Sequence, residues 1–144
     1  MHLKAAVAVG ALWFLGSSGA IADPPARCGD LTIDRATFGR QSDYPNDVSV
    51  LFDIRNVGAA TFNASPSVTV ALLMNVPGGL HKIGTAQFPA LVLTPGAGVA
   101  GHIQGPVPPN FHPPFPGMFI RFTDAAGNPT TIDCHPSNDQ RAVY

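Results

Sequence analysis

An all-β protein, an antiparallel sandwich of about seven short strands, is the fold that this sequence predicts. Apolar and polar residues alternate with a period of two over several segments, and turn residues separate these segments at short intervals. Gly and Pro number 15 each in 144 residues, which leaves little uninterrupted sequence for long helices. Hydrophobic residues at 45 % supply a packed core, and the length favours a single domain.

The first half of the chain contains the clearest strands. Leu31 to Phe38 is the first one expected. The next runs over residues 48–55, where one face collects four apolar side chains, Val48, Val50, Phe52 and Ile54. Asn56-Val57-Gly58 ends it, because Asn and Gly tolerate the positive φ of a tight turn. Residues 67–74 alternate again but carry apolar residues on both faces, so we expect this strand to be buried on both sides.

Proline and glycine divide the second half. A turn at Pro77-Gly78-Gly79 precedes residues 81–93, which we expect to form one strand or two short ones broken near Pro89, because proline cannot donate to a central ladder. Three further strands are expected at residues 99–104, 118–123 and 130–134, and the last two are joined by a hairpin loop at 124–129.

The first 22 residues have the pattern of a signal peptide. Lys4 supplies a positive charge, residues 5–15 supply an apolar run, and Ala20-Ile21-Ala22 is the small-x-small site that a signal peptidase cleaves. The run is too short to span a bilayer, and no later segment approaches that length. We therefore expect an exported protein, periplasmic or secreted to the cell surface, with a single domain over residues 23–144.

Export affects the interpretation of the only two cysteines, Cys28 and Cys134. Thiols in an oxidising compartment pair unless something prevents it, so we expect a Cys28–Cys134 disulfide. It would close most of the mature chain into one loop, worth roughly 4–5 kcal/mol in the chain-entropy model. A reactive or metal-binding cysteine is the alternative, but neither position has a CxxC spacing or a cationic cluster nearby.

Several motifs, in their order along the chain, resemble a bacterial immunoglobulin-like module. They are Ile54-Arg55-Asn56-Val57-Gly58, Ser67-Val68-Thr69-Val70-Ala71-Leu72, Ile83-Gly84-Thr85-Ala86, residues 91–96, Pro116-Gly117, residues 119–122, Asp124-Ala125-Ala126-Gly127-Asn128 and Ser137-Asn138-Asp139. Together they span about residues 32–139 and resemble the CARDB domain (cell-adhesion-related domain found in bacteria). The resemblance implies an immunoglobulin-like β-sandwich that serves as a non-enzymatic adhesive or spacer module. Cys134-His135-Pro136 and a long loop at 105–117 depart from the family pattern.

Composition disfavours several classes of function. The chain has no Glu and nine Asp, most of them at turns, and it lacks nucleophile, metalloprotease and phosphate-binding motifs, so we expect no enzyme. A net charge of -1 without a basic run gives no electrostatic basis for binding nucleic acid. Carbohydrate is disfavoured as well, because the mature chain has no Trp and its only tyrosines are Tyr44 and Tyr144.

The loop at residues 105–117 is the candidate interaction surface. Six prolines in thirteen residues impose extended geometry, so Phe111 and Phe115 cannot simply alternate into a sheet. A stiff loop that displays Phe111, His112 and Phe115 would lose little entropy when it binds a protein partner. The alternative is that both rings cap the open end of the core, which is the commoner position for Phe. An exposed sheet edge that accepts a partner's strand is a further candidate.

A calcium site is the alternative function. Hard cations bind clusters of carboxylate and amide oxygens, and such groups are concentrated near the C-terminus, at Asp124, Asn128, Asp133, Asn138 and Asp139. Turn chemistry explains the same residues, and the spacing of an EF-hand is absent, so no cofactor is the first expectation. The histidines show no short ligand spacing either: His81, His102, His112 and His135.

Overall fold

The structure, a computed structural model, describes residues 28–39, 43–64, 67–115, 117–130 and 135–144. The predicted signal peptide, residues 1–22, lies outside these ranges. The described residues form antiparallel strands and one short 3₁₀ turn, η1 (Pro136–Asn138). None of them belongs to a helix long and apolar enough to cross a membrane.

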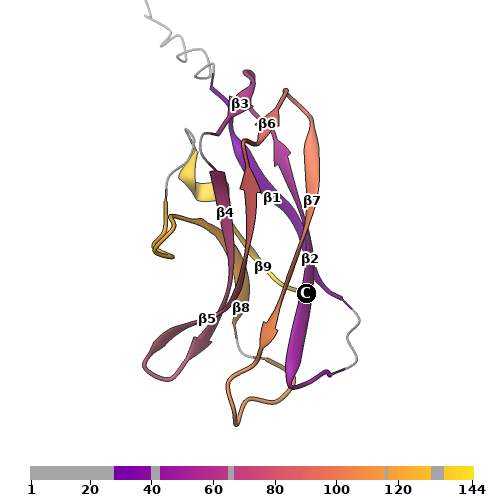
Figure 1. The fold of residues 1–144 in the computed structure, drawn as a ribbon, viewed down its shortest axis with the longest axis vertical. Coiled ribbons are helices and arrows are strands. Elements are labelled where there is room, and N and C mark those ends of the chain that lie inside the picture. The colour runs from indigo at the N-terminus through magenta and orange to yellow at the C-terminus, as the bar shows by residue number, and fades with distance from the viewer. Residues whose placement is uncertain (1–27, 40–42, 65–66, 116, 131–134) are drawn as a thin grey trace, which may run out of the picture.

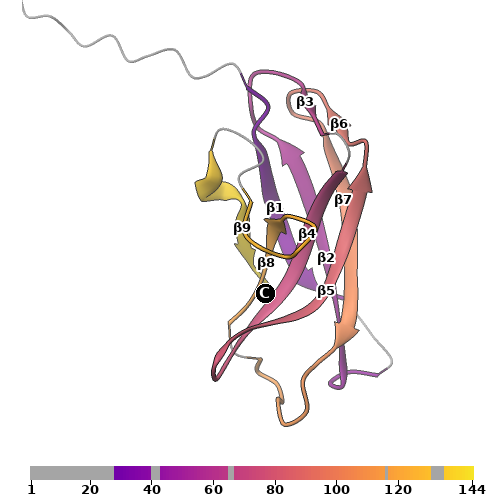
Figure 2. The same ribbon diagram turned by 60° about the vertical axis from the view of Figure 1, so that its left-hand side comes forward.

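Two main sheets form a sandwich (Figures 1 and 2). The first has the order β1-β2-β7 and consists of β1 (Leu31–Phe38), β2 (Asp47–Asn56) and β7 (Gly98–Pro106). The second has the order β5-β4-β8-β9 and consists of β5 (Gly79–Pro89), β4 (Ser67–Val76), β8 (Met118–Thr123) and β9 (Gln140–Ala142). A small pair, β3 (Phe62–Asn63) and β6 (Val92–Leu93), forms one end. The predicted all-β, antiparallel sandwich is confirmed.

Alternating side chains of both sheets build the core. The four apolar residues predicted on one face of β2 are all at most 1 % exposed. The apolar residues on the inner face of β4 are equally buried, and so are Ile120 and Phe122 of β8. The alternation in the sequence therefore identifies the two inner faces, because side chains on one face of a strand recur every second residue.

Strand β4 is also buried on its outer face, as the sequence predicts. Ala71 is 0 % and Leu73 4 % exposed, although both point away from the core residues of this strand. In the register of the sheet, Leu73 lies between Phe119 of β8 and Lys82 of β5. Strand β4 is therefore a central strand flanked by neighbours with long side chains. Its burial on both faces explains its nearly continuous apolar sequence.

The two sheets approach each other along both of their long sides. On one side, a Cβ on Gly84 of β5 would lie 2.8 Å from the carbonyl oxygen of Gln104 of β7, and one on Gly105 would collide with the carbonyl of Ile83. On the other side, Phe38 N donates to Tyr144 O (3.1 Å), and Tyr144 N donates to Ala36 O (3.2 Å). The edges of β1 and β7 are therefore partly covered by the second sheet and by the C-terminal residues that follow β9 (Figure 2).

The segment expected over residues 81–93 follows the two-strand alternative, since β5 ends at Pro89 and β6 comes next. Other strand predictions need correction. Strands β3 and β9 were not predicted. Of the strand expected at 130–134, Thr130 is not in a strand, and residues 131–134 lie outside the described ranges.

Candidate functional site

The register between β2 and β7 brings two distant segments together at one end of the sandwich. Asp47, the first residue of β2, is paired with Pro106, the last residue of β7. Val107 N then donates to Asn46 O (2.8 Å), which extends the contact by one residue beyond both strands. The turn before β2 and the proline-rich loop after β7 therefore lie side by side.

Aromatic rings gather at this end of the molecule. The Phe115 ring centroid lies 5.9 Å from that of Tyr44, nearly perpendicular at 83°, and 6.3 Å from that of Phe38. Phe38 is 40 % exposed and Tyr44 51 % exposed. We call Phe38, Tyr44 and Phe115 the aromatic patch. The backbone of Tyr144 is hydrogen-bonded to that of Phe38, so both tyrosines of the chain are near these phenylalanines.

The three residues predicted as the interaction surface have different environments. Phe111 and Phe115 are half-buried and pack against the core, whereas His112 is exposed. The two alternatives for the rings are therefore both realised in part, because each ring caps the core and keeps a solvent-facing side. Sequence reasoning missed Phe38 and Tyr44, which are the more exposed members of the aromatic patch.

A surface pocket of about 220 Å³ lies beside the aromatic patch. It forms where the turn before β2 meets the loop after β7, and its lining consists of Pro45, Asn46, Val107, Pro108, Pro109, Asn110, Phe111 and His112. Phe111 and His112 of the predicted surface thus line this pocket, and Phe115 belongs to the aromatic patch.

Asp124 and Asn128, two of the predicted calcium ligands, hydrogen-bond to each other. Asn128 N donates to Asp124 Oδ1 (2.9 Å), and Asn128 Nδ2 donates to Asp124 Oδ2 (3.1 Å). These hydrogen bonds from Asn128 hold the pKa of the Asp124 carboxyl below its ordinary value. Both carboxylate oxygens therefore already serve the hairpin loop, as the turn interpretation requires.

The remaining predicted calcium ligands are distributed differently. Asn138 Nδ2 donates to Asp30 Oδ1 (2.9 Å), Asp139 is buried, and Asp133 lies outside the described residues. Within the described part of the chain, no three His, Cys or Asp side chains are grouped so that they could hold a metal ion. The calcium site stays a prediction, and nothing in its described members favours it.

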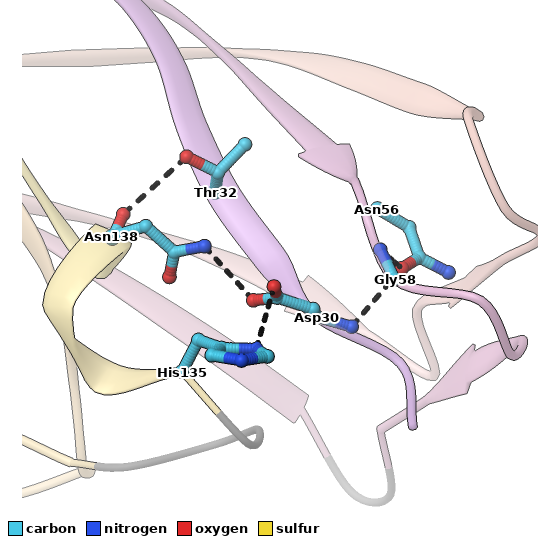
Figure 3. A network of polar contacts seen from close by, with 6 residues as sticks. All are labelled: Asp30, Thr32, Asn56, Gly58, His135 and Asn138. Atoms are coloured by element: carbon cyan, nitrogen blue, oxygen red, sulfur yellow. Dashed lines mark hydrogen bonds and ion pairs between the residues drawn. The ribbon is translucent and has the colours of Figure 1, made fainter. Parts of the chain in front are cut away.

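A polar network joins β1 to the C-terminal part of the chain (Figure 3). His135 Nδ1 lies 3.0 Å from Asp30 Oδ2, and Thr32 Oγ1 donates to Asn138 O (3.5 Å). Asp30 is two residues from Cys28, and His135 follows Cys134, so the contact between them places the flanks of both cysteines together. Cys134 itself lies outside the described residues, and the disulfide stays a prediction.

One histidine has a contact that sequence reasoning missed. His102 Nε2 lies 2.7 Å from Ser49 Oγ across the outer face of the first sheet. Ser49 is 5 % exposed, and among the described residues no other side chain is hydrogen-bonded to the His102 ring. A serine nucleophile needs an accessible oxygen and an oriented base, so we interpret this pair as a cross-strand polar contact.

These observations define an all-β sandwich with an exposed aromatic surface at one end. A sandwich by itself assigns no chemistry, so the aromatic patch and the pocket carry the functional argument. Comparison with the models of known protein families gives no match. A search of the curated proteins gives no match either.

Proposed function

We propose that this protein is an exported, non-enzymatic β-sandwich module that binds another protein in adhesion or assembly at the cell surface. The exposed aromatic patch is the single observation that carries this proposal. The resemblance to CARDB domains supports it, since that family implies adhesive or spacer modules. Export rests on the signal-peptide pattern, and the mass of the natively exported protein should correspond to a chain that begins at Asp23.

The aromatic patch has the properties of a binding anchor. Rings that are 40–51 % exposed before binding have apolar area left to bury, and aromatic side chains dominate the energy of many interfaces. The patch is also stiff, because Phe115 belongs to a proline-rich loop and contacts both other rings. A preorganised surface loses less conformational entropy when a partner docks.

The sheet edges have less support as the binding surface. Strand addition needs a row of free backbone N–H and C=O groups. Backbone hydrogen bonds to Tyr144 occupy part of the β1 edge, and the close approach of β5 obstructs part of β7. A partner would therefore meet side chains more readily than backbone.

Capture of partners from the exported fraction of the source cell tests the proposal. The double variant Phe38→Ser, Tyr44→Ser should fold with the thermal midpoint little changed yet lose the captured protein, because both residues are already 40–51 % exposed. Val92→Ser in β6, at the opposite end of the sandwich, removes an equally exposed apolar side chain and should keep the partner (Figure 1). Equal capture by both variants would refute the aromatic patch as the binding surface.

A further inference from the structure

We infer that the pocket beside the aromatic patch is a binding site for one neutral pyranose ring of a saccharide. The inference goes beyond the protein partner proposed above and does not depend on it. It is carried by four properties of the pocket: its stiffness, its hydrogen-bonding groups, its charge and its size.

The walls of the pocket are held in place by the backbone. Val107 N donates to Asn46 O (2.8 Å), Asn46 N donates to Asp43 O (2.8 Å), and Phe111 N donates to Pro108 O (3.3 Å). Three of the eight lining residues are prolines, whose φ is fixed by the ring. The site therefore exists before a ligand arrives, and little ordering entropy opposes binding.

The polar side chains of the pocket are free to bind a ligand. Asn46, Asn110 and His112 are exposed, and within the described structure their side chains make no hydrogen bond to the protein. Amide groups and an imidazole both donate and accept, which suits hydroxyl groups that also do both. Asn110 has φ of 76°, a conformation that Asn tolerates better than most residues.

The charge around the pocket selects against ions. Among the described residues of the lining, His112 is the only titratable one, so they provide no fixed cation to hold a phosphate, sulfate or carboxylate. Asp43 and Asp47 flank the turn, and their negative charges add repulsion toward anions. None of the described lining residues carries a carboxylate, so the lining offers no carboxylate ligand to a hard metal ion.

Size and apolar surface then favour a single sugar ring. Pockets that enclose drug-sized ligands have volumes of about 300–1,000 Å³, and this pocket is smaller, at about 220 Å³. Phe111 and the prolines provide apolar surface for the C–H face of a pyranose. Tyr44 immediately precedes Pro45, so a longer glycan would extend onto the aromatic patch. Tyr44, one of the two tyrosines of the chain, thus lies next to a residue of the pocket lining.

Titration of the isotope-labelled, purified protein with methyl glycosides tests the inference, followed by amide and imidazole NMR signals. The probes are the methyl glycosides of glucose, galactose, mannose and N-acetylglucosamine, with glucose 6-phosphate as the anionic comparison. At least one neutral glycoside should give saturable shifts at the side-chain amides of Asn46 and Asn110 and at His112. The phosphorylated sugar should bind more weakly.

Two pocket variants make the test specific. Asn110→Gly keeps the backbone conformation but removes one side-chain amide of the lining, and Asn46→Ala removes the other. Each should weaken the binding of the responsive glycoside about tenfold, as loss of about 1.4 kcal/mol predicts, whereas the exposed Asn63→Ala in β3 should change nothing. The inference is overturned if no glycoside gives saturable pocket shifts, if affinity is unchanged in both pocket variants, or if the phosphate binds best. The titration contains no partner protein, so its failure would leave the capture experiment unaffected.

Discussion

At the scale of single residues, Asn56 has the most demanding environment in the described structure. It is 0 % exposed, at the end of β2. Its Oδ1 accepts hydrogen bonds from Asp30 N (3.1 Å) and Gly58 N (3.0 Å), and its Nδ2 donates to Ala60 O and Leu93 O (both 2.8 Å). One amide side chain therefore fixes the entry to β1, the loop after β2 and the strand β6.

Replacement of Asn56 by Asp should destabilise the protein although the shape of the side chain is kept. A carboxylate oxygen would face the two carbonyls that now accept hydrogen bonds, and each buried carbonyl left without a donor costs about 1–3 kcal/mol. We expect the free energy of unfolding in urea to fall by about 3 kcal/mol or more at neutral pH. The loss should be smaller at acidic pH, where the protonated carboxyl regains one donor. The exposed Asn63→Asp is the control, and equal unfolding curves for the two variants would contradict the role of Asn56.

The hairpin loop should respond to acid at Asp124. Hydrogen bonds from Asn128 lower the pKa of this carboxyl, so they favour the folded turn when the carboxyl is ionised. The contribution is therefore present above the ordinary pKa of Asp and is lost as pH falls through the lowered one. The Asn128 amide proton, followed by NMR, should titrate with a midpoint below that of an ordinary Asp. In Asn128→Ala the pKa of Asp124 should rise, and an unchanged midpoint would contradict the assignment.

The sequence could predict the position of Asn56 but not its role. The run Asn56-Val57-Gly58 does follow the end of β2, but the expected reason is wrong, because neither Asn56 nor Gly58 has a positive φ. Gly58 is instead needed for a close approach, since a Cβ there would collide with the backbone of Cys28 and Asp30. The partners Asp30 and Leu93 come from distant parts of the chain, and no local pattern encodes their approach. The same limit applies to Ser49 and His102, which are diagonal neighbours only because β2 and β7 pair in this register.

At the scale of elements, prediction succeeded where a strand contributes several residues to the core. The periodic segments correspond to β2 and β4, and β1 and β8 have the predicted bounds. Strand β9 has three residues, all exposed, so its sequence contains no apolar alternation to detect. It forms through backbone pairing with β8, and β3 and β6 similarly pair over two residues each. Pairing of this kind depends on tertiary position rather than on the strand's own sequence.

Only part of the candidate site could be predicted from the sequence. Proline content alone identifies the loop that carries Phe111, His112 and Phe115. Phe38 and Tyr44 look like an ordinary strand end and an ordinary turn residue. They join the site because the β1–β2 and β2–β7 registers bring the start of β2, the end of β1 and the end of β7 to one place.

The contact between β5 and β7 predicts that Gly105 tolerates no side chain. Its Cβ would collide with the carbonyl of Ile83, so Gly105→Ala must push the two strands apart. Overpacking of this kind costs about 1–3 kcal/mol, and we expect a loss of that size in thermal or urea unfolding. Gln104→Ala, at the exposed neighbouring position of β7, should change stability by no more than about 0.5 kcal/mol. An equal loss of stability in the two variants would mean that the strands are not in close contact at this point.

At the scale of the whole molecule, the predicted Cys28–Cys134 disulfide should reinforce the junction of β1 with the C-terminal part of the chain. Removal of a long-loop disulfide costs about 2–5 kcal/mol in a domain of this size. We therefore expect reduction to lower the thermal midpoint by several degrees. Alkylation of the natively exported protein under denaturing conditions, before and after reduction, tests the bond itself. Two thiols labelled without reduction would refute the disulfide.

The contacts between β1 and the C-terminal residues also determine when folding can be completed. Thr32 and Asn138, which contact each other at this junction, are 106 residues apart in the chain, and Ala36 and Phe38 bond to Tyr144. Contacts so distant in sequence form slowly, because a long loop must close before they contribute. A chain that crosses a membrane with its N-terminus first would deliver β1 well before Tyr144. If the protein is exported as proposed, the sandwich would therefore stay incomplete until Tyr144 has crossed, and a pathway that exports unfolded chains would suit it.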